Sequence, residues 1–274
     1  MKAARPLAGL RVGISVSNSA DLEDRGFTPA GMNRLTVSLA GALLDAGATL
    51  AFGHDWRREG IMEAVCHAAL DSFGCPEGDA PPLILNLIPW PEKTVVPAGV
   101  LSRLPGLMAI EEAGLPPELR EAGERVPTRD SEAWRDLRAR GLTYLRQRLT
   151  EVCEARVCLG GKESGYEGRY PGILEEALFA LEAGQPLYLV GLLGGAALHL
   201  GQTILDDAPP PAEFGAEVRD AWSRARGLGV ERLAANGLSL EENRRLLETS
   251  VEGEVFHLIL AGLLRQQREA LPPV

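Results

Sequence analysis

ARVCLGGKESGYEGRYPGILEE, residues 155–176, carries the clearest indication of the fold class in this chain. It begins with a short apolar run that ends at Gly160 and Gly161, passes through a glycine- and charge-rich segment, and reaches Pro171. Proline suits the first turn of a helix, where its missing N–H would have had no partner. A strand, a glycine loop and a helix start in this order bring backbone N–H groups together where an anion can bind. An ordinary βα turn has the same pattern, so the interpretation needs support from the rest of the chain.

Three further strand ends have a similar design. The β-rich run 10–16 is followed by small hydroxyl side chains, which suit phosphate or ribose oxygens as well as a simple turn. The runs 50–52 and 186–190 end in glycines that lead into helices, and glycine lets a backbone approach either a phosphate or another helix. The candidate nucleotide-binding residues are Ser15, Ser17, Ser19, Gly53, Asp55, Gly60, Glu63, Gly160, Gly161, Lys162, Arg169, Gly172, Glu175, Gly191, Gly194 and Gly195.

Strands and helices alternate along most of the chain. Amphipathic helices are expected at 29–46 and 131–150, and a buried strand at 83–90, whereas residues 95–128 show no clear pattern and are expected to pack on the sheet edge. The alternation predicts an α/β fold: a Rossmann-like, doubly wound, mostly parallel sheet with helices on both faces. In such a sheet the four strand ends share one edge, which makes a nucleotide-sized polyanion the leading class of ligand. A Walker lysine motif and a GxGxxG motif after the first strand are both missing, which argues against P-loop enzymes and dinucleotide dehydrogenases.

Two parts of the chain are distinguished. Residues 1–210 are expected to form the nucleotide-binding domain. Residues 211–274 begin with a proline-rich connection and continue as helices, including amphipathic ones at 241–247 and 251–268. This C-terminal helical extension is expected to pack on the same domain or to form a partner surface.

Composition limits the classes of function. The chain has 274 residues, 45% hydrophobic and 24% charged, with a net charge of −10, which is typical of a globular protein and unfavourable for sequence-independent nucleic-acid binding. Its apolar runs are too short to cross a bilayer, and we expect no signal peptide. Cys66, Cys75, Cys153 and Cys158 form no CxxC pair, and the four histidines are scattered, so we expect a cytoplasmic protein without a metal site.

The order of motifs resembles the SLOG superfamily, which joins the DNA-processing protein DprA and the cytokinin-activating LOG phosphoribohydrolases. Within it the chain looks similar to bacterial SLOG domains found beside TIR domains in anti-phage defence. The segments that carry this resemblance are ISVSNSADL (14–22), FGHDWRREGIMEA (52–64), LGGKESGYEGRYPGILEEAL (159–178), PLYLVGLLGGAA (186–197) and ENRRLLET (242–249).

The LOG motif PGGxGT followed by a glutamate implies further roles. By this resemblance Glu176 stands at the position of the catalytic glutamate, and Arg146 at that of the arginine in the preceding helix. Two departures are visible: residues 162–171 are inserted after the glycine pair, and Ile173 replaces the threonine whose hydroxyl would meet phosphate.

Three hypotheses follow. The first is a binding module for an adenine nucleotide such as ADP-ribose, with Lys162 and Arg169 at phosphate and Glu175 or Asp55 at ribose. The second is an N-glycosidase or glycosyl transferase in which Glu176 and Arg146 act on a nucleotide. The third is a homo-oligomeric interaction module without a ligand. We expect no required cofactor and a homo-oligomer, and the resemblance implies a TIR or other effector protein as a candidate partner.

Overall fold

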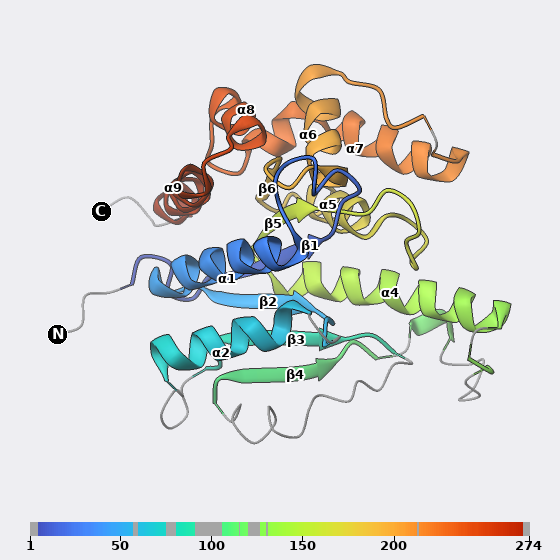
Figure 1. Ribbon diagram of the computed structural model, residues 1–274, viewed down its shortest axis with the longest axis horizontal. Helices are drawn as coiled ribbons and strands as arrows, with labels where there is room; N and C mark the ends of the chain where they lie inside the picture. Colours follow the sequence, from blue (N-terminus) through green and yellow to red (C-terminus); the bar gives the residue numbers. More distant parts are fainter. Residues whose placement is uncertain are drawn as a thin grey trace.

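The computed structural model describes residues 5–56, 60–74, 81–90, 106–114, 116–119, 127–129, 131–212 and 214–270. Its centre is a six-stranded sheet with the order β4-β3-β2-β1-β5-β6, in which every neighbouring pair is parallel. The predicted Rossmann-like, doubly wound α/β fold is confirmed (Figure 1). The strands are β1 (Arg11–Ser17), β2 (Thr49–Gly53), β3 (Ile84–Ile88), β4 (Met108–Glu112), β5 (Ala155–Gly160) and β6 (Leu187–Val190).

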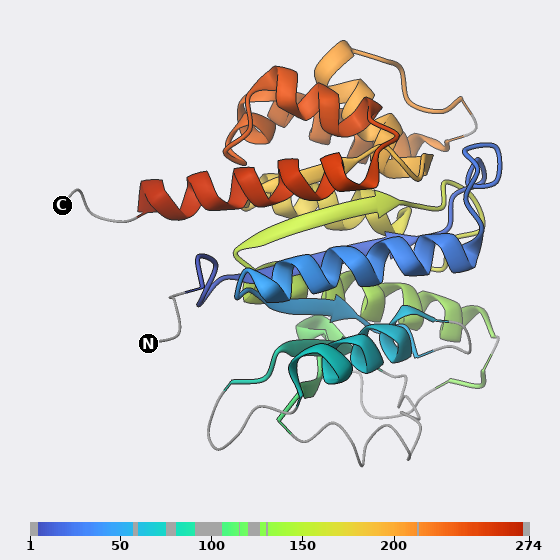
Figure 2. The same ribbon diagram turned by 60° about the vertical axis from the view of Figure 1, so that its left-hand side comes forward.

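Helices cover both faces of this sheet. Side chains from α1 and α2 share one core with β1 and β2, whereas those from α4 and α5 form two cores on the opposite face. Figures 1 and 2 show this three-layer arrangement from two sides. The helices are α1 (Pro29–Asp45), α2 (Ile61–Phe73), the 3-10 turn η1 (Pro117–Leu119), α4 (Glu132–Val152), α5 (Gly172–Glu182), α6 (Gly195–Asp206), α7 (Ala216–Ala234), α8 (Leu240–Glu248) and α9 (Glu252–Ala270).

Capping residues in the sequence mark where several helices begin. The Thr28 hydroxyl accepts a hydrogen bond from the N–H of Gly31 (3.1 Å), and Ser131 accepts one from the N–H of Trp134 (3.1 Å). At α8, Ser239 and Glu242 form a capping box that satisfies two backbone N–H groups reciprocally. These local bonds fix the ends of helices whose apolar faces then pack on the sheet.

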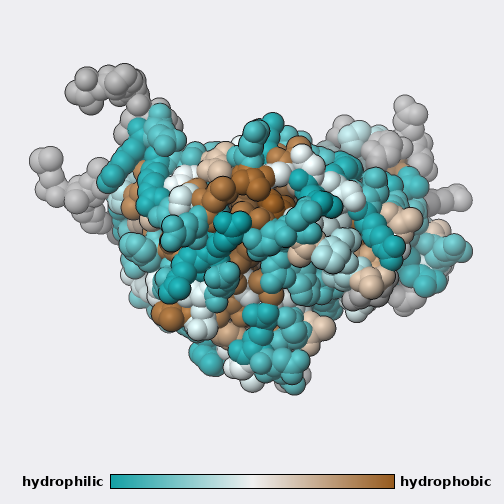
Figure 3. Space-filling view, turned by 90° about the horizontal axis from the view of Figure 1, so that it is seen from above, coloured by the Kyte–Doolittle hydropathy of each residue, from teal (hydrophilic) through white to brown (hydrophobic). Residues whose placement is uncertain are grey.

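The C-terminal helices lie on both sides of the β6 end of the sheet. Helix α7 packs on α5 and α6, α8 packs on β6, and α9 lies beside α1, as Figure 2 shows. Seen from above, the molecule has a compact apolar patch surrounded by hydrophilic side chains (Figure 3). Among the described residues, the large apolar side chains with substantial exposure are Leu240 (40%), the first residue of α8, and Val251 (57%), which directly precedes α9.

The region 95–128 contains an element that the sequence did not reveal. Strand β4 occupies the edge position beside β3, where only an irregular excursion was expected. Its sequence, MAIEE, has a single large β-branched residue and two glutamates, and Glu111 and Glu112 are exposed. An edge strand that is half exposed lacks the apolar run typical of central strands. The described part of this region is 106–114, 116–119 and 127–128.

The cysteines follow the expectation for small buried hydrophobes where the structure describes them. Cys66, Cys153 and Cys158 are free thiols in the core, and burial raises the pKa of Cys66 and of Cys158 to about 12. Cys75 lies outside the described residues. Among the helices of the described ranges, none has the length and apolar character required to span a membrane.

Replacement of Asn236 tests how the C-terminal helices are joined to the sheet. This fully buried amide donates to the Leu187 carbonyl and to Asn243 Oδ1 (both 2.8 Å) and accepts from the Leu238 N–H (2.9 Å). Asn236→Ala leaves these groups unpaired, and we expect the free energy of unfolding in urea to fall by about 2–4 kcal/mol. The exposed Asn18→Ala control should change it by about 0.5 kcal/mol or less. Equal effects of both substitutions would contradict this account.

Candidate functional site

The carboxyl edge of the sheet has a topological switch point between β1 and β5. The chain leaves β1 toward the α1 side and leaves β5 toward the α5 side, so the two connections diverge. The last residues of the two strands, Ser17 and Gly160, face each other in register. Ligands of open α/β sheets bind in the crevice at such a point. The predicted strand ends therefore share one edge, as a parallel sheet requires.

The Gly160–Gly161 pair is needed for close packing at this point. Both residues have positive φ (+64° and +116°), and a Cβ on Gly160 would lie 2.4 Å from the Ser17 carbonyl oxygen. A Cβ on Gly161 would lie 2.8 Å from Ile173 and 3.0 Å from Ala196, at the starts of α5 and α6. The Gly161 N–H donates to the Ser17 carbonyl (2.9 Å), so this amide is directed at the protein. The pair brings two helix starts together instead of offering its own amides to a ligand.

The amino end of α6 is occupied by a side chain of the protein. Asp21 Oδ1 accepts from the N–H of Gly195 (3.0 Å), and a Cβ on Gly194 would collide with the same carboxylate at 2.1 Å. Ser19, beside it, donates to the Leu193 carbonyl (2.5 Å), and Arg25 pairs with Asp21 (2.9 Å). Asp21 was not among the sequence candidates, although an aspartate four residues after a strand is a plausible capping signal.

The amino end of α2 is filled in a similar way. Asp55 Oδ2 accepts from the N–H of Ile61 (3.3 Å), which makes it a capping residue beside Gly60. The Gly53 carbonyl accepts from the buried Asn86 side chain (3.2 Å), while Glu63 is exposed in the first turn of the helix. These contacts are local structure, and a carboxylate at a helix start is favoured by the macrodipole.

Gly191 lies on the carboxyl edge but faces α8. A Cβ on Gly191 would be 2.0 Å from the Leu247 carbonyl oxygen, and the residue is buried. Glycine is required at position 191 because the end of β6 packs directly on the backbone of α8. The structure therefore separates Gly191 from the switch point, whereas Gly194 and Gly195 lie against Ser19 and Asp21.

The amino end of α5 is different: among the described residues no side chain accepts from its first N–H groups, whereas Asp55 and Asp21 do so at α2 and α6. Within the described residues, the N–H groups of Gly172, Ile173 and Leu174 have no hydrogen-bond acceptor. The Arg146 guanidinium lies against this end: its Nη2 would be 2.8 Å from a Cβ on Gly172, and its Nη1 2.6 Å from one on Gly168. Three free amides beside a guanidinium form a local positive centre at the switch point.

Two glutamates balance the charges below this centre. Glu175, only 1% exposed, forms an ion pair with Arg146 Nη1 and accepts from the Thr143 hydroxyl (2.7 Å). Glu176, 16% exposed, accepts from Arg156 Nη1 (2.8 Å) and from the Ser15 hydroxyl through Oε2. Its Oε1 lies 3.7 Å from Arg146 Nε. The structure thus brings together Ser15, Arg146, Glu175 and Glu176 from the predicted set.

Arg156 is the member of this cluster that sequence reasoning missed. It is the second residue of β5 and is 1% exposed. In the sequence it interrupts an otherwise apolar strand. The signal was a charged side chain inside a strand buried on both faces, which is rare unless the charge is paired.

The inserted segment 162–171 crosses the start of α5 and is attached to three helices by ion pairs. Lys162 is exposed, and among the described residues it has no ion-pair or hydrogen-bond partner. The segment's other charged side chains are paired: Glu163 with His199 of α6 (2.7 Å), Glu167 with Arg138 of α4 (2.6 Å), and Arg169 with Glu217 of α7 (2.5 Å). Arg169, predicted to meet phosphate, is therefore directed toward α7 and also lies over the Tyr170 ring (5.3 Å).

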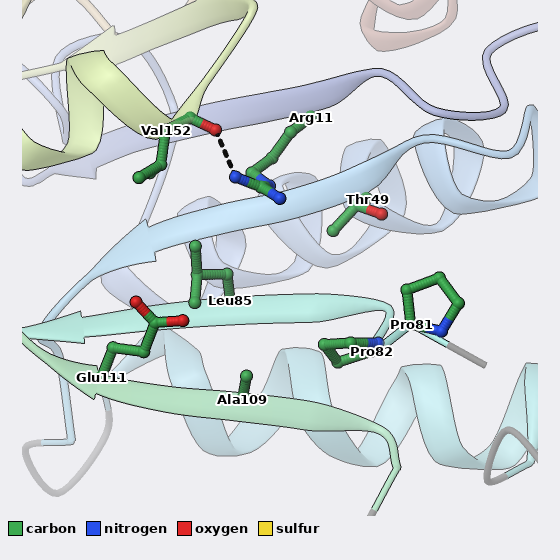
Figure 4. A pocket seen from close by; sticks show the side chains of 8 residues that line it. All are labelled: Arg11, Thr49, Pro81, Pro82, Leu85, Ala109, Glu111 and Val152. Carbon is green, nitrogen blue, oxygen red and sulfur yellow. Dashed lines mark hydrogen bonds between the residues drawn. The ribbon is translucent and has the colours of Figure 1, made fainter. Parts of the chain in front are cut away.

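A separate cavity of about 290 Å³ lies on the α4 side of the sheet. It is lined by the first residues of β1 and β2, Arg11 and Thr49, and by Glu111 of β4, as Figure 4 shows. Arg11 donates to the Val152 carbonyl (2.7 Å) across one side of it. Arg11, Thr49, Pro81 and Pro82 place most of this cavity at the amino half of the sheet, while Glu111 is level with the carboxyl end of β2. Within the described ranges, no group of three His, Cys, Asp or Glu residues is arranged to hold a metal ion.

The Asp21 contact predicts a pH-dependent contribution to stability. Burial alone would raise the pKa of Asp21, but the hydrogen bond from Arg25 and the neighbouring Ser19 hydroxyl bring it below its usual value. A lowered pKa means that the stabilisation is complete above the ordinary aspartate range and is lost as the pH falls through the folded-state pKa. We expect Asp21→Asn to reduce the unfolding free energy by about 1 kcal/mol at neutral pH. In urea titrations the difference from wild type should shrink as the pH falls below the ordinary aspartate pKa; a difference that is constant with pH would contradict the assignment.

The Glu163–His199 pair predicts the opposite pH trend. The hydrogen bond to Glu163 raises the pKa of His199, with burial opposing it, Asp21 adding to it and Arg25 reducing it. A raised pKa means that the stabilisation is complete below the ordinary histidine pKa and is lost as the pH rises through the folded-state value. His199→Gln should therefore lower the melting temperature at about pH 6 and leave it nearly unchanged at about pH 9. A difference that grows with pH would exclude this pairing as a source of stability.

Comparison with known proteins places this geometry in a family. The family model described as SLOG cluster2 matches residues 6–221, well over half of the chain. The comparison with curated proteins gave no match. The matched range includes all six strands and the α5 amino end, and it stops within α7. The chain therefore belongs to the SLOG family, which associates it, at a coarse level, with the binding of nucleotide-related ligands.

Proposed function

We propose that this SLOG domain binds a nucleotide or nucleotide sugar of the ADP-ribose, cyclic ADP-ribose or NAD-derived type at the carboxyl edge of its sheet. The observation that carries the proposal is the uncapped amino end of α5 with the Arg146 guanidinium beside it, at the switch point between β1 and β5. Phosphate oxygens are the natural acceptors for free helix N–H groups and a guanidinium. The exposed Lys162, directly after the glycine pair, adds a second cation.

The contrast among the three helix starts supports this location. Asp55 and Asp21 already fill the starts of α2 and α6, so an anion there would meet a carboxylate. Of these three helix starts, and within the described residues, α5 is the one where amides and a guanidinium lie together without a capping carboxylate. Glu175 is enclosed and saturated by Arg146 and Thr143, so its role in the proposal is to hold Arg146 and not to contact ribose.

Catalysis is the second candidate function, and one distance favours it. Glu176 Oε1 lies 3.7 Å from Arg146 Nε, so the two residues that the LOG resemblance implies are neighbours. In that reaction Glu176 would stabilise an oxocarbenium-like ribose while Arg146 holds phosphate. Binding is preferred because Glu176 Oε2 is already engaged by two donors and Ile173 offers no hydroxyl to a phosphate.

An interaction module is the third candidate. The apolar patch of Figure 3 favours it, since exposed apolar surface rimmed by polar side chains is typical of protein contacts. In the preferred proposal the same surface joins copies of the chain or a TIR or other effector, so that a bound nucleotide acts as a signal in anti-phage defence.

A nucleotide panel distinguishes these functions. Purified protein is titrated calorimetrically with AMP, ADP, ADP-ribose, cyclic ADP-ribose and NAD, and each mixture is analysed by mass spectrometry. We expect binding of at least one intact adenine nucleotide, and a loss of affinity of about tenfold or more in Arg146→Met because charge-assisted bonds to phosphate are removed. The matched control is Arg148→Met on the same helix, whose partner is the exposed Glu151.

The outcomes separate the three candidates. If wild type releases a free base and the Glu176→Gln variant does not, catalysis becomes the preferred function in place of binding. Full affinity in Arg146→Met, with the melting temperature unchanged, would remove α5 from the site. No binding of any member of the panel would overturn the nucleotide proposal and leave the interaction module.

A further inference from the structure

Arg156 occupies a slot that the sheet builds for it. Its guanidinium lies on the α5 side of β5, donates to Glu176 Oε2 (2.8 Å) and to the Ser15 hydroxyl (3.0 Å), and is 1% exposed. On the neighbouring strand Gly13 leaves the space: a Cβ there would lie 3.3 Å from Arg156 Nη1. The Thr150 hydroxyl, at 3.5 Å from Nη2, borders the same slot. Three elements, β1, α4 and α5, thus supply small or polar residues around one guanidinium.

This arrangement is poorly explained by stability alone. Removing two charges from water costs more than their attraction commonly returns, and apolar residues of similar volume often stabilise a core better. Arg156 Nε is also buried without a hydrogen-bond partner within the described residues. The pair nevertheless lies in the centre of a parallel sheet, where the neighbouring positions are Val157 and Ala155. Its presence there indicates a role in the candidate site.

The geometry of Glu176 indicates the role of this ion pair. Ser15 and Arg156 both bind Oε2, so the carboxylate is held by one oxygen and cannot rotate freely. Its second oxygen, Oε1, is 3.7 Å from Arg146, the residue beside the uncapped start of α5. Glu176 also retains 16% exposure, in contrast to the 1% of Glu175.

We propose that Arg156 and Ser15 are positioning residues, which hold Glu176 so that Oε1 accepts a ribose hydroxyl of a nucleotide whose phosphate lies at Arg146 and α5. The assignment rests on the proposed function. It predicts which ligands the site selects: ribonucleotides bind more tightly than their deoxy counterparts. A carboxylate that is held to accept a hydroxyl loses its partner when the hydroxyl is missing, and such sites discriminate strongly.

Arg156 has a second effect on the same ligand. An unpaired Glu176 next to Arg146 would offset the positive charge that a phosphate requires. Because Arg156 pairs with Glu176 and Arg146 with Glu175, the two arginines and two glutamates sum to zero, and the α5 amino end stays the local positive pole. A nucleotide can then meet an acceptor for ribose and a donor set for phosphate within one site.

The test compares hydroxyl selectivity and not affinity alone. AMP and ADP-ribose, each with its 2′-deoxyadenosine and 3′-deoxyadenosine counterpart, are titrated into wild type, Ser15→Ala and Arg156→Met. We expect wild type to prefer the ribo form over at least one deoxy form by about tenfold, as for a hydrogen bond to a charged group. Both variants should reduce this preference to about threefold or less, because Glu176 is no longer held.

Thr203→Val serves as the matched control for a merely structural loss. Its hydroxyl accepts from Trp222 Nε1 (2.7 Å) in the buried α6–α7 contact, so the variant should melt at a lower temperature and keep the ribose preference. If Arg156→Met does not fold, Ser15→Ala, which removes only one hydroxyl, decides the question.

Each result has a distinct meaning. Variants that bind more weakly but keep the wild-type preference would show that Arg156 and Ser15 only stabilise the core. Wild type that binds adenine nucleotides without distinguishing the deoxy forms would overturn this inference and leave the proposed function intact. Failure of wild type to bind any nucleotide of the wider panel would contradict both this inference and the proposed function.

Discussion

Close packing where β1 meets β5 governs the carboxyl edge of this protein. Gly160 and Gly161 lie so near β1, α5 and α6 that a Cβ on either would overlap neighbouring atoms. Because both helices begin in contact with the same pair, their amino ends are directed to one place on the sheet edge. The glycines therefore shape the site by placing helix starts, which is a different role from binding an anion with their own amides.

Charge compensation then distinguishes one helix start from the others. The macrodipole makes every helix amino end attractive to anions, and the protein uses its own carboxylates, Asp55 and Asp21, at α2 and α6. At α5 it provides Arg146 instead, with the counter-charge of Glu175 buried behind it. In a chain with a net charge of −10, this local positive centre is the basis of the proposed anion site.

The buried ionic cluster links this centre to the sheet. Arg156 on β5 holds Glu176 on α5, and Ser15 on β1 completes the contact, so the two central strands and the helix are tied at one carboxylate. The segment 162–171 lies across the same helix start and is attached by ion pairs to α4, α6 and α7. Ion pairs near the surface contribute about 0–1 kcal/mol each, and the burial of Tyr170 in the core formed with α5, α6 and α7 also holds this segment.

The parallel α/β sheet, the common edge of its glycine-marked strand ends and the SLOG family could be predicted before folding was known, because strand–helix alternation and turn residues are local patterns. Sequence reasoning missed β4, whose half-exposed edge position leaves no apolar run, and it missed Arg156. The free helix start, and the carboxylate that faces Arg146, follow from three-dimensional packing. Asp21 caps α6 from a loop 174 positions earlier in the chain, and Glu176 meets Ser15 across 161 positions. Contacts of that range depend on how helices pack on the sheet, and no local pattern encodes them.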